Sequence, residues 1–299
     1  MRLDVGHPGR VPFTQEASTN RSHVATSTRV EGEEQPGGPE VASGGWPGSG
    51  LIPVLTILFG VGLAFYLAVE PTLPWVLLVV MGLAALGTDG VIRSHPEADF
   101  RDVSDTAPYL FVPTLFALSA GLFLEDTVVG YWTLVATVVA AIGMGATVYG
   151  EYVSVNVGAP AYPAARFILN VATYLTAFGL YAAVYSFDVS LIPAALAVGA
   201  TSVLLAAEVL REGEPGLARM VVLAGAIGLV VAEARWALYF LPLEGFLAAV
   251  FLLLVFYLST GLVHHYVTGN LSRSVALEFV SVALAGLAVV VVGRIATGV

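Results

Sequence analysis

Residues 133–185 read TLVATVVAAIGMGATVYGEYVSVNVGAPAYPAARFILNVATYLTAFGLYAAVY, and this stretch decides the fold. It holds two apolar runs that are each long enough to cross a bilayer as a helix. A short loop that contains Gly and Pro separates them, and short loops join antiparallel neighbours. We therefore predict two membrane helices, over residues 128–149 and 164–186, joined by residues 152–163.

Both predicted helices carry polar side chains along one side. At about 100° per residue, those of the second helix fall within about a third of its circumference. They include Arg166, Asn170, Thr173, Tyr174 and Tyr181. Because lipid offers such groups no hydrogen-bonding partner, the face should look into the protein.

Glu151 and Arg166 occupy facing ends of the two helices. Glu151 closes the first helix and Arg166 opens the second, so both lie at the same membrane surface. We expect them to pair or to share a polar pocket that opens to the cytoplasm. A purely structural ion pair at the interface would also account for them.

Composition places the whole chain among membrane proteins. Of its 299 residues, 57% are hydrophobic and 11% are charged, whereas soluble domains carry about 25% charged residues. The chain has no cysteine, which excludes disulfides, thiol nucleophiles and cysteine metal sites. It also has no lysine, which excludes Schiff-base chemistry. A net charge of −10 argues against nucleic acid as a partner.

The apolar pattern continues on both sides of this central pair. We predict an all-α integral membrane protein whose residues 49–299 form one bundle of nine transmembrane helices. The predicted spans are 51–69, 73–92, 108–124, 128–149, 164–186, 190–210, 217–239, 243–265 and 274–296. Small residues four apart, such as Ala141 with Gly145 and Ala224 with Gly228, favour close contact between helices.

Residues 1–48 differ in composition from the rest. They are rich in Gly, Pro, Ser, Thr and Glu and show no helical periodicity. Such a segment buries too little apolar surface to fold alone, and it has no apolar core of the signal-peptide kind. We expect a disordered tail.

Charge alternates from one break between spans to the next. Acidic residues fill the breaks after spans one, three, five and seven, and arginine fills the others. Arginine marks the cytoplasmic side, so we expect a cytoplasmic N-terminus and an external C-terminus in the cell membrane of a prokaryote. Arg235 and Arg294 lie near the outer surface, where we expect them to reach outward, Arg235 beside Trp236.

The cytoplasmic half collects most of the polar candidates for a pocket. They are Glu151, Arg166, Asn170, Thr173, Tyr181, Glu208, His264, His265 and Glu278. Glu278 shares a helical face with Ser274 and Ser281, so we expect it to point inward. Neighbouring histidines point about 100° apart, so we interpret His264 and His265 as interfacial residues without a metal.

Two acidic clusters suggest an alternative. One is His95-Pro-Glu-Ala-Asp99-Phe-Arg-Asp102-Val-Ser-Asp105, and the other is Glu208-Val-Leu-Arg-Glu212. Two such clusters on cytoplasmic loops of a nine-span protein resemble intramembrane prenyltransferases. That resemblance implies Mg²⁺ held against a diphosphate by Asp99, Asp102, Asp105, Glu208 and Glu212. The chain departs from the family pattern, because no Asn precedes Asp99 and the second cluster is all glutamate. A solvated acidic loop is the simpler interpretation.

The C-terminal third carries a second resemblance. Three segments carry it: Ala232-Glu-Ala-Arg-Trp-Ala-Leu-Tyr-Phe-Leu-Pro, Phe256-Tyr-Leu-Ser-Thr-Gly-Leu-Val-His-His and Ser272-Arg-Ser-Val-Ala-Leu-Glu-Phe. They resemble an uncharacterised family of bacterial polytopic membrane proteins, over roughly Leu217 to Arg294. This resemblance implies no catalytic residue.

The sequence therefore favours a multi-pass membrane protein without enzymatic activity. We expect a transporter-like or accessory protein with a cytoplasm-facing polar pocket, membrane lipid as its partner and no cofactor. The alternative is the magnesium-dependent lipid enzyme, so whether the protein is an enzyme stays open, as do its protein partners.

Overall fold

The computed structural model describes residues 50–98, 100, 102–213, 216–241, 243, 245–270 and 272–297. The tail predicted over residues 1–48 lies outside the described residues. Within the described ranges the chain forms nine α-helices and no strand, and each helix is long and apolar enough to cross a membrane. This confirms the prediction of an all-α integral membrane protein.

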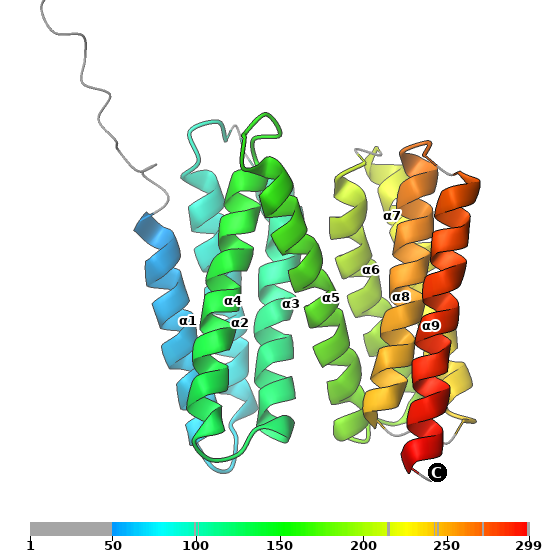
Figure 1. Cartoon of the computed structure of the whole chain (residues 1–299). Coiled ribbons are helices and arrows are strands. Elements are labelled where there is room, and N and C mark those ends of the chain that lie inside the picture. Colours follow the sequence, from blue (N-terminus) through cyan, green and yellow to red (C-terminus); the bar gives the residue numbers. More distant parts are fainter. Residues whose placement is uncertain are drawn as a thin grey trace, which may run out of the picture. The chain divides into compact units, whose positions relative to one another are not determined.

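The nine helices follow the predicted spans closely. Their bounds are α1 (Leu51–Ala68), α2 (Pro74–Arg93), α3 (Val103–Thr127), α4 (Trp132–Ser154), α5 (Tyr162–Ser186), α6 (Leu191–Arg211), α7 (Leu217–Leu238), α8 (Gly245–Val267) and α9 (Arg273–Thr297). Figure 1 shows them running up and down in turn. The end that carries the α2–α3 and α4–α5 connections is called the α4–α5 end below. The end that carries the α1–α2 and α3–α4 connections is called the α1–α2 end.

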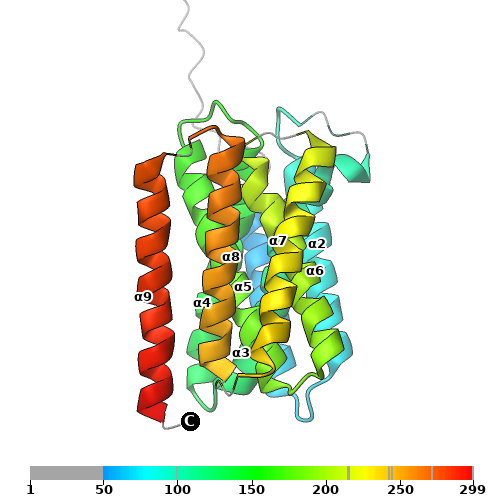
Figure 2. The same ribbon diagram turned by 90° about the vertical axis from the view of Figure 1, so that its right-hand side faces the viewer.

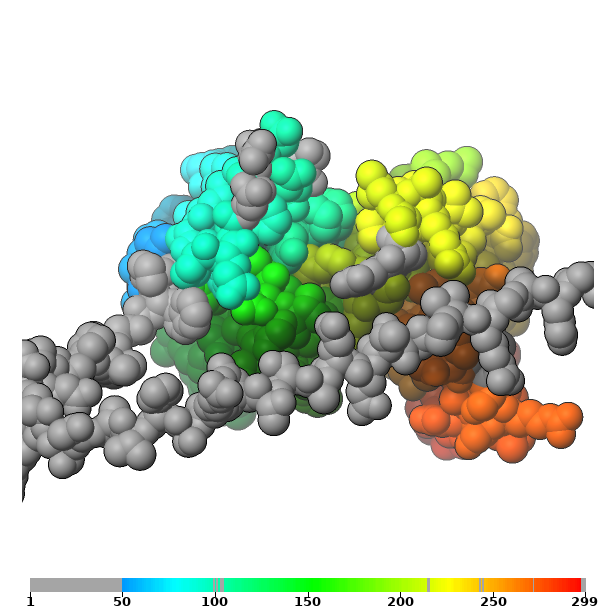
Figure 3. Space-filling model, turned by 90° about the horizontal axis from the view of Figure 1, so that it is seen from above, coloured from blue at the N-terminus to red at the C-terminus, as the bar shows by residue number. Residues whose placement is uncertain are grey.

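Two apolar cores hold the helices together. One core joins α1, α2, α3 and α4 around Phe59, Leu63 and Met144. The other joins α3, α5, α6, α7 and α8 around Tyr181 and Phe256. Figure 3, which looks onto the α4–α5 end, shows the blue-to-cyan helices on one side and the yellow-to-orange helices on the other. Helix α5 packs against both groups, and 56% of its span is buried.

Helix α9 is the opposite of α5. Only 6% of its span is buried, and it packs against α8. Figure 2 shows it at the edge of the bundle, beside α8. Most of the surface of α9 is therefore exposed on the outside of the bundle.

Small residues bring neighbouring helices close together, as their spacing predicted. A Cβ placed on Gly228 of α7 would lie 2.7 Å from the carbonyl oxygen of Gly199 on α6. A Cβ placed on Gly145 of α4 would lie 2.5 Å from Oγ1 of Thr56 on α1. Only glycine permits these approaches, which increase the van der Waals contact between helices in a membrane.

Two predicted boundaries were wrong. Helix α3 begins at Val103, five residues before the predicted span, and Pro108 and Pro113 lie inside it. Neighbouring helices let membrane helices tolerate internal proline.

Helix α4 runs to Ser154, five residues beyond the predicted end, so Glu151 lies within a helix and not at its end. The apolar pattern stops early because the last turn of α4 is polar, yet Glu151, Tyr152, Val153 and Ser154 are all buried.

Candidate functional site

Three helices bring charged side chains together at the α4–α5 end. Glu151 lies one turn before the end of α4, and Arg166 lies one turn after the start of α5. Glu208 and Arg211 lie in the last turn of α6, and Glu212 follows that helix directly. We call these five residues the charge network.

The network is continuous from α4 to α5 through α6. One nitrogen of Arg211, Nη2, lies 2.8 Å from Oε2 of Glu151 and 2.9 Å from Oε1 of Glu208. The same Oε1 of Glu208 lies 2.8 Å from Nη1 of Arg166. Arg166 also donates a hydrogen bond of 3.2 Å to the carbonyl oxygen of Glu208, and its Nε lies 3.8 Å from Oε2 of Glu212.

The pairing differs from the simplest expectation for Glu151 and Arg166. They belong to one network, but Glu151 pairs with Arg211 and Arg166 pairs with Glu208. Arg211 is three residues after Glu208 in α6, so both side chains lie on one helical face. The spacing of Glu208 and Arg211 in the sequence could therefore have indicated that Arg211 joins the network.

Burial makes this arrangement unusual for a helix end. Glu151 is 0% exposed and Glu208 is 1% exposed, while Arg166 is 4% exposed. Arg211 also donates a hydrogen bond of 3.1 Å to Oγ of Ser154, and its guanidinium lies 4.0 Å from the ring centroid of Tyr109 on α3. Nothing in the sequence indicated that Tyr109 lies beside the network.

Each of the four innermost charged groups keeps one buried polar atom that makes no hydrogen bond with any described residue. These atoms are Oε1 of Glu151, Oε2 of Glu208, Nε of Arg166 and Nη1 of Arg211. Three carboxylates and two guanidinium groups give the network a formal charge of −1 when all are ionised. Two of these atoms are carboxylate oxygens, which accept hydrogen bonds, and two are guanidinium nitrogens, which donate them.

The polar face of α5 continues inward from Arg166. Thr173 and Thr176 are fully buried, and neither hydroxyl has a hydrogen-bond partner among the described residues. Tyr181 is also buried, and its hydroxyl lies 2.6 Å from Oγ of Ser202 on α6. Asn170 is half-buried. This face therefore looks into the bundle, and its hydroxyl groups reach toward the membrane centre.

The remaining pocket candidates lie on α8 and α9. The rings of His264 and His265 are half-buried with centroids 5.9 Å apart, and His265 also packs against Phe279 of α9. Among the described residues, no hydrogen bond, ion pair or ring contact joins them to the charge network. Glu278 is exposed, so the expectation that it points inward was wrong. The reason is that α9 packs against a single neighbour and cannot enclose the face that carries Glu278.

Two of the acidic residues from the predicted clusters stabilise the start of α3, and a third lies beside Arg166 at the end of α6. Asp102 precedes α3, and its backbone N–H donates a hydrogen bond of 3.1 Å to Asp105, as in a capping box. Glu212 lies beside Arg166 in the charge network. Asp99 lies outside the described residues. In the described part of the chain, no group of three or more His, Asp or Glu side chains is placed to hold a metal ion.

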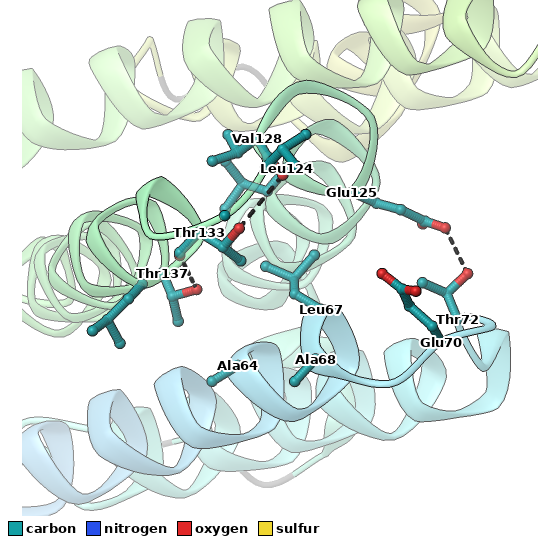
Figure 4. Close-up of a pocket in the computed structure, with 13 residues that line it drawn as sticks. Ala64, Leu67, Ala68, Glu70, Thr72, Leu124, Glu125, Val128, Thr133 and Thr137 are labelled. Atoms are coloured by element: carbon teal, nitrogen blue, oxygen red, sulfur yellow. Dashed lines mark hydrogen bonds between the residues drawn. The ribbon is translucent and has the colours of Figure 1, made fainter.

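The α1–α2 end carries a cavity of about 560 Å³ between the ends of α1 and α3 and the start of α4. Figure 4 shows Glu125 of α3 pointing toward Thr72, with Glu70 beside it. Glu125 accepts a hydrogen bond of 2.6 Å from Thr72 and a second from the hydroxyl of Tyr66. This carboxylate is satisfied by neutral hydroxyl groups and not by arginine.

The fold and the charge network at the α4–α5 end define a multi-pass membrane protein, whose described residues form nine apolar helices. A family model described as "Protein of unknown function (DUF5656)" matches residues 51–293, and the chain belongs to that family. The match spans all of α1 to α8 and most of α9. Comparison with curated proteins finds no match, and neither does comparison with solved structures.

Proposed function

We propose that this protein is a non-enzymatic, transporter-like membrane protein whose charge network handles a proton or a small cation. The observation that carries the proposal is a pair of buried carboxylate oxygens, Oε1 of Glu151 and Oε2 of Glu208, that accept no hydrogen bond from the described residues. Ionisable groups in membrane helices are costly, and they are retained where a pathway or a ligand uses them.

The hydroxyl groups of α5 supply the route to the site. Thr173 and Thr176 continue the polar face from Arg166, and both hydroxyls lack partners among the described residues. A buried hydroxyl without a partner is unfavourable, so water or a passing ligand is the natural partner for each. A structural role alone would be better served by alanine or leucine at these positions.

The absence of cysteine allows a direct test of this route. In Thr173→Cys the new thiol is the only one in the protein, and it replaces a side chain of similar size. The protein would be reconstituted in liposomes and treated with a cationic methanethiosulfonate reagent. We expect Thr173→Cys to become labelled, which mass spectrometry measures directly.

Ala172→Cys is the matched control. Ala172 directly precedes Thr173 in α5, points about 100° away from it, is buried, and belongs to an apolar core. We expect no labelling there, and slower labelling of Thr173→Cys when Glu208→Gln removes one negative charge from the network. If Thr173→Cys is as inert as Ala172→Cys in folded protein, the polar face serves helix packing alone.

Orientation follows from arginine bias and is part of the same proposal. We place the α4–α5 end, and with it the charge network, in the cytoplasm of a prokaryotic cell, with lipid around the bundle. Reporter fusions at Glu125 and at Glu212 should then report outside and inside, respectively. The same compartment for both would contradict this orientation.

The prenyltransferase alternative stays a prediction without a supporting contact. Glu208 is engaged by Arg166 and Arg211, and Asp102 lies at the start of α3. A Mg²⁺ titration of the purified protein is the simplest check, with Glu212→Gln as the variant that removes one proposed ligand.

A further inference from the structure

A second buried arginine lies at the opposite end of the bundle. Arg235 of α7 is 5% exposed, although its position near a helix end predicted that it reaches outward beside Trp236. That expectation was wrong, because the guanidinium packs over the ring of Tyr185, 4.5 Å from its centroid. Tyr185 lies near the end of α5, on the wall that faces α7.

Arg235 has no anionic partner in the described part of the chain. No carboxylate of the described residues lies within ion-pair distance of it, and its buried Nε has no hydrogen bond. Exposed Glu233, two residues away, points to another side of α7. A buried guanidinium without a counter-ion is strongly unfavourable, so an anion that binds beside it stabilises the folded protein.

This arginine borders a cavity of about 420 Å³. The cavity lies between the end of α5, the start of α6 and the end of α7, and Tyr185, Asp188, Ser190 and Tyr239 also line it. The hydroxyl of Tyr185 is buried and has no hydrogen bond within the described chain. The cavity therefore presents a cation and a second unused hydrogen-bonding group, with a volume typical of a ligand pocket.

The position of the cavity indicates where a ligand would come from. Arg235 lies three residues before the end of α7, at the depth where headgroups meet a membrane helix. Exposed Trp236, Tyr239 and Phe240 lie at the same end of α7, as in an aromatic belt. A lipid in this belt has its phosphate at the level of the guanidinium.

We propose that Arg235 and Tyr185 form a binding site for the phosphate of a membrane lipid headgroup. Guanidinium groups bind phosphate through paired hydrogen bonds, and a phenol donates a further one. Asp188 is exposed and lines the same cavity, so its negative charge opposes the binding of any anion there.

The test measures thermal unfolding of the purified full chain in detergent with three additives: phosphatidylglycerol, phosphatidylcholine and inorganic phosphate. We expect phosphatidylglycerol to raise the unfolding temperature most, because binding to the folded state stabilises it. A rise with inorganic phosphate that matches the rise with lipid would identify free phosphate as the ligand and overturn the lipid assignment.

Variants show whether Arg235 causes the rise in unfolding temperature with phosphatidylglycerol. Arg235→Gln should abolish the rise, and Arg294→Gln should keep it, because Arg294 is an exposed arginine at the same end. Tyr185→Phe keeps the ring under the guanidinium and should reduce the rise, which covers the case in which Arg235→Gln fails to fold. Asp188→Asn should increase it. The proposal is overturned if Arg235→Gln responds like the unmodified protein, or if Asp188→Asn lowers the response.

Discussion

The two ends of the bundle bury the same kinds of charged side chain in different ways. At the α4–α5 end, Arg166 and Arg211 are paired with Glu151 and Glu208 at 2.8–2.9 Å. At the α1–α2 end, Arg235 stacks on a tyrosine and borders a cavity. A paired charge needs no ligand for its stability, whereas an unpaired one does. The two proposals rest on this difference: the first end is proposed to handle protons or small cations, and the second to bind an anion.

The largest expected effect is the loss of stability in Arg211→Gln, and Arg235→Gln at the other end should lose less. Arg211→Gln leaves Glu151 buried without its cation, and breaking a buried pair in this way costs about 3–5 kcal/mol. Arg235→Gln loses a desolvated stacking contact of about 2 kcal/mol but relieves an unpaired charge. Thermal unfolding in phosphate-free detergent measures both variants, and equal losses would erase the distinction between the ends.

A double-mutant cycle shows whether pairing accounts for the first effect. Glu151→Gln and Arg211→Gln, singly and together, should give a coupling free energy of about 1–3 kcal/mol, because the two groups are in direct contact. Asp89 and Arg93 form the control pair at the same end, 2.8 Å apart but partly exposed. Their coupling should be only about 0.3–0.5 kcal/mol.

The α1–α2 end has a carboxylate with two neutral partners, and its removal should have a moderate effect. In Glu125→Gln both hydroxyl donors lose a charged acceptor, because one then faces an NH2 group and the other a neutral carbonyl oxygen. The change should cost about 1.5 kcal/mol of unfolding free energy. Asp126→Asn changes the adjacent exposed carboxylate and should stay within about 0.5 kcal/mol of the parent. Equal effects would show that the hydroxyl contacts of Glu125 do not stabilise this end.

The smallest effect concerns pH at the α4–α5 end. Burial beside Tyr152 lowers the pKa of His95, although Glu97 opposes the shift, and Nδ1 accepts a hydrogen bond of 3.2 Å from the Glu97 backbone. The folded state therefore binds this proton less readily than the unfolded state. Stability should fall slightly as the pH drops below the ordinary histidine pKa of about 6.5. His95→Gln should reduce that dependence, and a parent protein that gains stability at low pH would contradict the assignment.

Most of the fold could be predicted from the sequence, and the reason is chemical. Apolar runs of about 20 residues have few alternatives to spanning a bilayer, so eight of nine spans begin within four residues of their predicted starts. Helix α3 is the exception, because its first turn is polar and proline follows it.

The site could be predicted only in part. The sequence indicated Glu151, Arg166 and Glu208, because charges near membrane helices are rare. Which of them pair depends on how α4, α5 and α6 are rotated against one another, and that is set by packing in the cores. The burial of Arg235 depends on Tyr185, 50 residues earlier, and the exposure of Glu278 depends on α9 having a single neighbour. No local pattern reports such distant contacts.

The span of the charge network has a consequence for how the chain enters the membrane. Glu151 and Arg211 are 60 residues apart, so synthesis at 5–20 residues per second separates them by roughly 3–12 s. During that interval Glu151 has no arginine from α6 to pair with. A lone charge at the bilayer centre costs about 2.5–3.5 kcal/mol, and Glu151, one turn from the end of α4, bears a part of that cost. We therefore expect helices α4, α5 and α6 to leave the insertion machinery together, as one assembled unit.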